Sequence, residues 1–424
     1  MRVGIWCDYG FTLEPSEGIG VFVANLAKGI IEASADAEIL LVPHPNKSKV
    51  LNPIVDQGNG RIKVAQRLSS SWIQRKAARR ICKSFDRMAH WIAKAHLPES
   101  TLLRSLQVAL ASPAAAAEIV ELEKRCDVWL VPYVGTDQKF NNPTVVAVHD
   151  LVAFHFPATV RPHQLQSLKR MVSTQVKQAD RLACMSEFIR QNDLLDILQA
   201  KPSETAVVRP AVPNFGPVTE SEATDLSSLG IEQPFIFYPA AFRTYKNHRL
   251  LVETLGHLRK NKELWPMQMV FTGIRSCPRW LRAYIKECRA ETEVVCLGKV
   301  SAEMLSRLYR SAFATVVPSL YEQGSFPIME AIHYGCPAVC SDIPSLREQF
   351  GDMGAAMLFF DPHSPKNLVE QLAHVGENRR HVIRGQQAAF AKFATRTWSD
   401  AAQEWLEVFE QAMGSRNTVP AKAA

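Results

Sequence analysis

Two glutamates in the C-terminal half have the spacing and neighbours of a site for an activated sugar. Glu322 and Glu330 lie in YEQGSFPIMEAIHYGCP, where Pro327 and Gly335 bracket a short helix by the usual start and stop asymmetry. Carboxylates accept paired hydrogen bonds from sugar hydroxyls, helix N-termini attract phosphate, and Gly324 lets the backbone approach a ligand. The pattern favours a sugar nucleotide. The alternative is that both acids only stabilise a helix N-terminus.

A second loop carries two cations. Arg243 and Lys246 follow the apolar run 235–239, in the segment PAAFRTYKNH that opens the next helix. Arginine can grip a pyrophosphate with its planar fork, and lysine can act as a point charge. Neutralising a leaving diphosphate would stabilise the transition state of sugar transfer. The alternative is a solvated surface loop.

Two further patterns come from the N-terminal half. Gly18 and Gly20 precede a predicted helix, but no third glycine follows at the dinucleotide spacing, which argues against a nicotinamide enzyme. His149 follows the apolar run 144–148. Taken alone, it would more often be an ordinary buried or solvated histidine.

The elements that position these residues read as parallel strands alternating with helices. The Pro-, Ser- and Thr-rich stretch 202–234 interrupts the rhythm and reads as a linker around one strand at 206–209. Other strands are predicted at 3–6, 38–42, 128–132, 144–148 and 181–185 before the linker, and at 235–239, 267–271, 293–297, 314–318 and 337–340 after it. We expect an α/β protein with two doubly wound units, whose ligands bind beyond the carboxyl ends of the strands.

Together these motifs resemble the retaining GT-B glycosyltransferases of family 4. The resemblance covers nearly the whole chain. Its pieces are Gly18-Ile19-Gly20, His149-Asp150, Ser186, Lys246, Gly273, Gly298, the pair Glu322 and Glu330, the following SDIPSLREQFGD, and Trp398-Ser399. It implies two Rossmann-like domains facing across a cleft: an acceptor-binding domain 1–210, a nucleotide-sugar domain 215–395, and a segment 396–424 whose helix returns to the first domain.

The resemblance also implies residue roles. Lys246 and Arg243 would hold the donor diphosphate, Glu330 the ribose hydroxyls, and Glu322 the transferred sugar. His149 would line the sugar and acceptor side of the cleft. The remaining donor or acceptor contacts would come from Gly18, Gly20, Gly273, Val300, Gln323, Gly324 and Ser325. The chain departs from the family in two places: EQGSFP stands where the family has EGFGLP, and the family's phosphate arginine sits nearer Ala240 or Ala241 than Arg243.

The implied activity is transfer of a hexosyl unit with retention of configuration, without a metal ion or other cofactor. The donor would be a nucleotide diphosphate sugar, with GDP-mannose favoured. The acceptor would be a saccharide or a polyprenyl-diphosphate-linked acceptor, in the biosynthesis of a lipopolysaccharide or exopolysaccharide. The alternatives are a catalytically silent nucleotide-sugar-binding subunit and a nucleotide-sugar epimerase or hydrolase.

The net positive charge of the chain comes from one segment. Residues 61–104 hold eleven Lys or Arg against two acids, a sum of +9 in a chain of net charge +7. On a helical wheel one face is apolar and the other basic, which suits an anionic membrane surface. The predicted membrane contacts are Arg75, Lys76, Arg79, Arg80, Lys83 and Arg87. The alternatives are a helix packed on its own domain and, less favoured, a nucleic-acid contact.

Composition excludes other classes. No run approaches the roughly 18 apolar residues of a membrane-spanning helix, and the start MRVGIWCDYG lacks the apolar core of a signal peptide. The nine cysteines contain no C-x-x-C pair, which argues against a disulfide framework and a zinc cluster. We therefore expect a cytoplasmic enzyme, peripheral at the inner face of the cell membrane.

Overall fold

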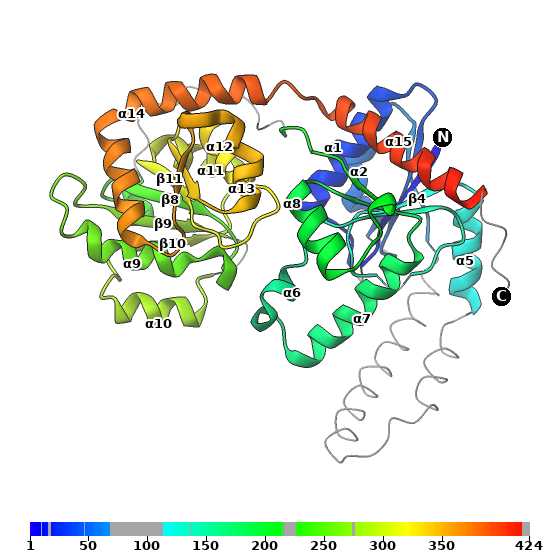
Figure 1. Ribbon diagram of the computed structural model, residues 1–424, viewed down its shortest axis with the longest axis horizontal. Coiled ribbons are helices and arrows are strands. Elements are labelled where there is room, and N and C mark those ends of the chain that lie inside the picture. The colour runs from blue at the N-terminus through cyan, green and yellow to red at the C-terminus, as the bar shows by residue number, and fades with distance from the viewer. Residues whose placement is uncertain are drawn as a thin grey trace, which may run out of the picture.

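The computed structural model describes residues 1–9, 11–15, 18–45, 47–67, 113–136, 138–213, 215, 226–273 and 276–417. The six predicted membrane contacts, from Arg75 to Arg87, lie outside these residues. Figure 1 shows two lobes side by side, each with strands covered by helices. Among the helices described, none is both long and apolar enough to cross a bilayer.

The first lobe contains a seven-stranded parallel sheet in the order β3-β2-β1-β4-β5-β6-β7. Its strands are β1 (Arg2–Cys7), β2 (Glu38–Pro43), β3 (Ile62–Val64), β4 (Val128–Val131), β5 (Thr144–Ala147), β6 (Arg181–Cys184) and β7 (Thr205–Val207). Its helices include α1 (Gly18–Ala33), α2 (Asn52–Val55), α5 (Pro113–Glu123), α6 (Val152–His155), α7 (Pro162–Gln178) and α8 (Glu187–Ile189), which continues into the π-helical η3 (Arg190–Ile197). The central strands are buried along their length, which explains their continuous apolar sequences.

The second lobe contains a six-stranded parallel sheet in the order β10-β9-β8-β11-β12-β13. Its strands are β8 (Phe235–Pro239), β9 (Gln268–Thr272), β10 (Val294–Gly298), β11 (Ala314–Val317), β12 (Ala338–Ser341) and β13 (Leu358–Phe360). Its helices are α9 (His248–Leu258), α10 (Arg279–Glu287), α11 (Ala302–Ser311), α12 (Phe326–His333), α13 (Pro344–Phe350) and α14 (Pro365–Phe393). The prediction of two doubly wound α/β units is confirmed.

Short 3₁₀ turns connect several of these elements. They are η1 (Ser48–Leu51), η2 (Pro157–Thr159), η4 (Pro202–Glu204), η5 (Ser227–Leu229), η6 (Thr244–Lys246) and η7 (Gly351–Ala356). The turn η6 matters for function because it lies between the end of β8 and the start of α9, where it places the Lys246 side chain.

The last helix crosses back to the first lobe. After α14 the chain forms α15 (Trp398–Asn417), which packs along α1 (Figure 1). Trp405 and Phe409 are buried in the hydrophobic cluster of the first sheet, where Trp405 contacts Phe22 of α1. The second lobe is therefore tied to the first by the linker before β8 and by α15.

Candidate active site

The site begins with a lysine and a glutamate brought together by two neighbouring strands. Lys246 follows β8 and Glu322 follows β11, and these strands pair in the second sheet. The Lys246 ammonium donates to Glu322 Oε1 at 2.5 Å, and the Ser319 hydroxyl donates to the same oxygen at 2.6 Å. The Glu322 side chain is 8% exposed and that of Lys246 is 19% exposed. The pair thus sits at the carboxyl edge of the sheet, partly open to a ligand.

The environment keeps Lys246 charged. Burial on its own would lower the pKa of Lys246, but the attraction of the Glu322 carboxylate and of the neighbouring phenol oxygens outweighs it, so that pKa is raised above its usual value. The amine is therefore an ammonium at neutral pH. A fixed cation at this position can neutralise a bound anion.

Glu330 occupies a separate polar position on α12. Its Oε2 accepts a hydrogen bond of 2.5 Å from the hydroxyl of Tyr309, a buried residue of α11. The Tyr309 ring stacks on Tyr334 with centroids 5.7 Å apart. Burial raises the pKa of Glu330, and the Tyr309 hydrogen bond opposes that rise. The structure thus holds Glu330 toward α11, on a set of contacts different from that of Lys246 and Glu322.

His149 lies two residues after the end of β5 in the first domain, at the domain interface. It is 6% exposed, and its Nε2 donates to the Pro132 carbonyl at 2.8 Å. Burial lowers the pKa of His149 to about 4, while its hydrogen bond with the Pro132 carbonyl and the neighbouring Gln323 side chain act in the opposite direction. Gln323 also reaches the first domain through a 3.1 Å contact from its amide nitrogen to Met185 Sδ. The residue after Glu322 is therefore in contact with the imidazole of the opposite domain.

The Arg243 side chain takes no part in the hydrogen bonds that join Lys246, Glu322 and Ser319. It is exposed and lines a cavity of about 370 Å³ between the domains, together with Tyr245 from its own domain and Asp150 and Tyr133 from the other. Most of the remaining wall is apolar, with Val134, Val152, Phe154, Val160, Leu168 and Val172. Burial raises the pKa of Asp150, and the charges of Asp193, Lys246 and Glu322 also act on it. Tyr245 in the cavity wall directly precedes Lys246 in the turn η6, so this end of the cavity adjoins the Lys246–Glu322 pair.

Two glycines of the first domain lie where the backbone passes the cavity. Gly18, with φ of +42°, and Gly20 begin α1, whose Ile19 lines the cavity. A Cβ on Gly20 would lie 1.7 Å from the Glu14 carbonyl oxygen, so only glycine fits there.

The other predicted donor contacts lie in the second domain. The Gly273 amide donates to the Gly298 carbonyl, and Val300 packs against the hydrophobic core of the second domain. Gly324 lies beside Gln349 of α13, whose side-chain oxygen accepts from the Ser325 amide at 2.9 Å. The Ser325 amide is therefore engaged within the protein, a partnership that the sequence did not indicate. Sequence reasoning also left Ser319, Tyr309 and Asp150 without roles; only Asp150 had a signal, because it follows His149 in a quoted motif.

Comparisons with known proteins agree with this architecture. Residues 223–396 match the family described as glycosyl transferases group 1. Two curated relatives are D-inositol 3-phosphate glycosyltransferase of Acidothermus cellulolyticus, 24% identical over 68% of this chain and 67% of its own length, and O-antigen chain mannosyltransferase B of Escherichia coli, 26% identical over 52% and 57%. The chain thus spans about two thirds of the first relative and little more than half of the second.

Solved structures share the fold over most of the chain. Sucrose-phosphate synthase from Thermosynechococcus elongatus superposes with a TM-score of 0.64 at 14% identity, covering 98% of this chain and 99% of its own. Anabaena Alr3699/HepE in complex with UDP and glucose superposes with a TM-score of 0.63 at 14% identity, covering 97% and 99%. At this identity the likeness shows the fold, which is that of the GT-B glycosyltransferases.

Proposed function

We propose that this chain, whose residues 223–396 match the group 1 glycosyltransferases and which has the GT-B fold, is a retaining, metal-independent hexosyltransferase of family 4 that uses a nucleotide diphosphate sugar. The observation that carries the proposal is the contact between Lys246 and Glu322 at the carboxyl edge of the second sheet. Such a site can bind an anion and a sugar side by side.

The pair suits the donor's charge. Breaking the bond between sugar and phosphate leaves a diphosphate with added negative charge, which the Lys246 ammonium would stabilise. Within the part of the chain that the structure describes, both hydrogen bonds to Glu322 use Oε1. Oε2 is then the oxygen for a hydroxyl of the transferred sugar. Glu330, held by Tyr309, would accept from the ribose hydroxyls, and the segment from Gly298 to Val300 would meet the base.

The acceptor would enter from the first domain. The cavity has a polar end at Asp150, Tyr133 and Arg243, next to the ion pair, and an apolar remainder. A saccharide hydroxyl at the polar end would lie near the reacting carbon, with Arg243 facing the acceptor side. His149 is neutral at pH 7 and its Nε2 is bonded to Pro132. We therefore assign it to shaping the cleft and assign proton removal to the leaving diphosphate, in a front-face substitution.

The wider setting is part of the proposal. We favour GDP-mannose and a lipid-linked acceptor in surface polysaccharide assembly. The choice of mannose is supported by the names of O-antigen chain mannosyltransferase B and of MMP alpha-(1->4)-mannosyltransferase of Mycolicibacterium hassiacum, which is 30% identical over 27% of this chain and 28% of its own length. The basic segment 61–104 would hold the enzyme at the inner face of the membrane. HepE was solved with UDP and glucose, so uridine donors are the competing choice.

A donor screen with the purified full chain tests the function. Among GDP-, UDP- and dTDP-sugars, one is expected to raise the melting temperature and to be consumed in the presence of acceptor and membranes. Lys246→Gln should reduce turnover by about a hundredfold or more, because it removes charge stabilisation of the leaving group. The exposed Lys260→Gln is the matched control and should retain activity.

Two outcomes would contradict the proposal. Nucleotide binding without any release of nucleoside diphosphate, even with acceptor and membranes, would favour a catalytically silent subunit. Conversion of the donor to an isomeric sugar nucleotide would favour an epimerase.

A further inference from the structure

The residue before Glu322 is anchored in the opposite domain. Tyr321 belongs to the loop between β11 and α12 of the second domain, yet it is 5% exposed and packs in a hydrophobic cluster of the first. Its hydroxyl donates to Asp193 Oδ2 at 2.6 Å. Its ring lies 4.6 Å from that of His155, between centroids, and 6.0 Å from that of Phe188. The donor loop is therefore fixed by the first domain as well as by its own.

Asp193 is a buried carboxylate that the proposed chemistry does not use. It lies on η3 and is fully buried. It accepts from Tyr321, from His155 Nε2 at 2.7 Å and from the Leu151 amide at 2.8 Å. A buried carboxylate is costly unless its hydrogen bonds are made. Separating the domains would remove the Tyr321 bond, so Asp193 favours the arrangement in which they meet.

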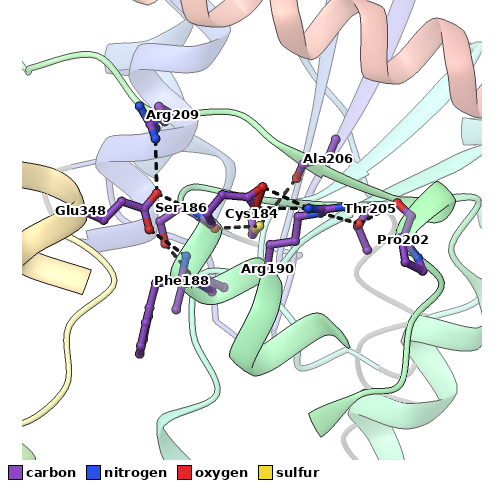
Figure 2. A network of polar contacts seen from close by, with 11 residues as sticks. Cys184, Ser186, Phe188, Arg190, Pro202, Thr205, Ala206, Arg209 and Glu348 are labelled. Atoms are coloured by element: carbon purple, nitrogen blue, oxygen red, sulfur yellow. Dashed lines mark hydrogen bonds and ion pairs between the residues drawn. The ribbon is translucent and has the colours of Figure 1, made fainter. Parts of the chain in front are cut away.

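A second contact between the domains converges on the same helix. Figure 2 shows Glu348, from α13 of the second domain, reaching the start of α8. Its carboxylate accepts from the amides of Glu187 and Phe188, each at 2.7 Å, and lies 3.5 Å from Arg209. Because α8 continues into η3, both contacts orient the segment that carries Asp193.

The loop alternates between the two domains. Tyr321 and Gln323 contact the first domain, through Asp193 and Met185, whereas Glu322 between them contacts Lys246 and Ser319 of the second. The Leu320 amide also donates to the Tyr245 carbonyl at 2.8 Å. A shift of the first domain would therefore move both neighbours of Glu322 and displace its carboxylate.

We propose that Tyr321 and Asp193 form a positioning latch that aligns Glu322 for sugar transfer only when the two domains are in contact. Neither residue touches substrate; both act through the loop. The inference rests on the proposed function and adds a device that couples domain closure to donor alignment.

The test removes one hydroxyl. Tyr321→Phe should lower kcat about tenfold or more, because a hydrogen bond to a buried carboxylate is lost and the loop is released. The donor KM should change less than about threefold, because Lys246 and Glu330 remain. Tyr284→Phe is the matched control: it loses a hydroxyl bond to Glu253 within the second domain, away from the interface, and should keep its kcat.

A double-mutant cycle assigns the effect to the contact. Asp193→Asn should also lower kcat, and combining it with Tyr321→Phe should cost less than the product of the two single effects. Fully multiplicative effects, or a Tyr321→Phe kcat within twofold of wild type, would overturn the latch. So would a fall in kcat accompanied by an equal rise in donor KM, since that would indicate general disruption of the site.

A readout without catalysis separates this inference from the proposed function. In Tyr321→Phe, amide hydrogen exchange should accelerate at Glu187 and Phe188, whose amides donate to Glu348 of the second domain, because the domains separate more often. Unchanged exchange at both amides would overturn the latch even in an active enzyme. Faster exchange in a protein without transferase activity would support the contact as a closure device and refute the proposed function alone.

Discussion

At the scale of the residue, chemistry depends on how each carboxylate is held. The Glu322 carboxylate accepts hydrogen bonds from Lys246 and Ser319, whereas the Glu330 carboxylate accepts one from the Tyr309 hydroxyl. The two acids are close in sequence but belong to different polar contacts. The first suits a reacting sugar and its diphosphate, and the second suits a ribose that must be bound but does not react.

Glu330→Gln tests that division of roles. The amide keeps an oxygen for the Tyr309 hydroxyl, so folding should be preserved, but it loses the charge that strengthens hydrogen bonds from ribose hydroxyls. We expect the donor KM to rise about tenfold with kcat nearly unchanged. Steady-state kinetics at saturating acceptor measure both. Unchanged donor kinetics would remove Glu330 from the nucleotide site.

At the scale of the element, the return of α15 to α1 depends on a close backbone approach. A Cβ on Gly29 of α1 would lie 2.3 Å from the carbonyl oxygen of Trp398, whereas a Cβ on Gly256 of α9 would meet nothing within 4 Å. We therefore expect substitution by alanine to have opposite effects on stability at these two helical glycines.

Gly29→Ala should lower the free energy of unfolding by about 1–3 kcal/mol, because the added methyl forces α15 away from α1. Gly256→Ala should raise it by about 0.5–1 kcal/mol, because alanine is the better helix former and space is available. Urea denaturation followed by circular dichroism measures both. Equal destabilisation by the two substitutions would show that the close approach of Trp398 does not determine the effect of a methyl group at Gly29.

The elements also show what the sequence could predict. The run FIFYP was predicted as a strand and is β8, because a buried parallel strand needs a continuous apolar sequence. The three-residue strands β3 and β13 were missed, since such short runs carry no periodicity. Lys246 and Glu322 could be expected near one another because both follow strands of one sheet. The contact between the two domains could not be predicted, because Asp193 and Tyr321 are 128 positions apart in the sequence and no local pattern links them.

At the scale of the whole molecule, the described part of each domain contains a buried, neutral histidine. Burial lowers the pKa of His149 to about 4, and burial together with the charge of Lys246 lowers that of His248 to about 3, against an ordinary value of 6.5. His248 is fully buried, and its ring contacts those of Tyr238, Phe242 and Phe271. Both imidazoles must therefore take up a proton if the chain unfolds in mild acid.

This uptake makes stability dependent on pH. Between pH 6.5 and about 4 the unfolded chain binds a proton at each histidine that the folded chain does not bind. The free energy of unfolding should therefore fall as the pH falls, by up to about 1.4 kcal/mol per pH unit for each histidine. Burial raises the pKa of Asp150 and Glu330, which acts in the opposite direction, so variants must be compared with wild type.

His248→Phe isolates one contribution, because phenylalanine matches the surrounding rings and cannot be protonated. Its free energy of unfolding, measured by urea denaturation from pH 7.5 to 5, should fall less steeply toward acid than that of wild type. His163→Gln, at an exposed position of α7, is the control and should keep the wild-type slope. If His248→Phe kept the wild-type slope, the imidazole would have to be protonated in the folded protein, and its buried aromatic surroundings would have to admit a second positive charge near Lys246.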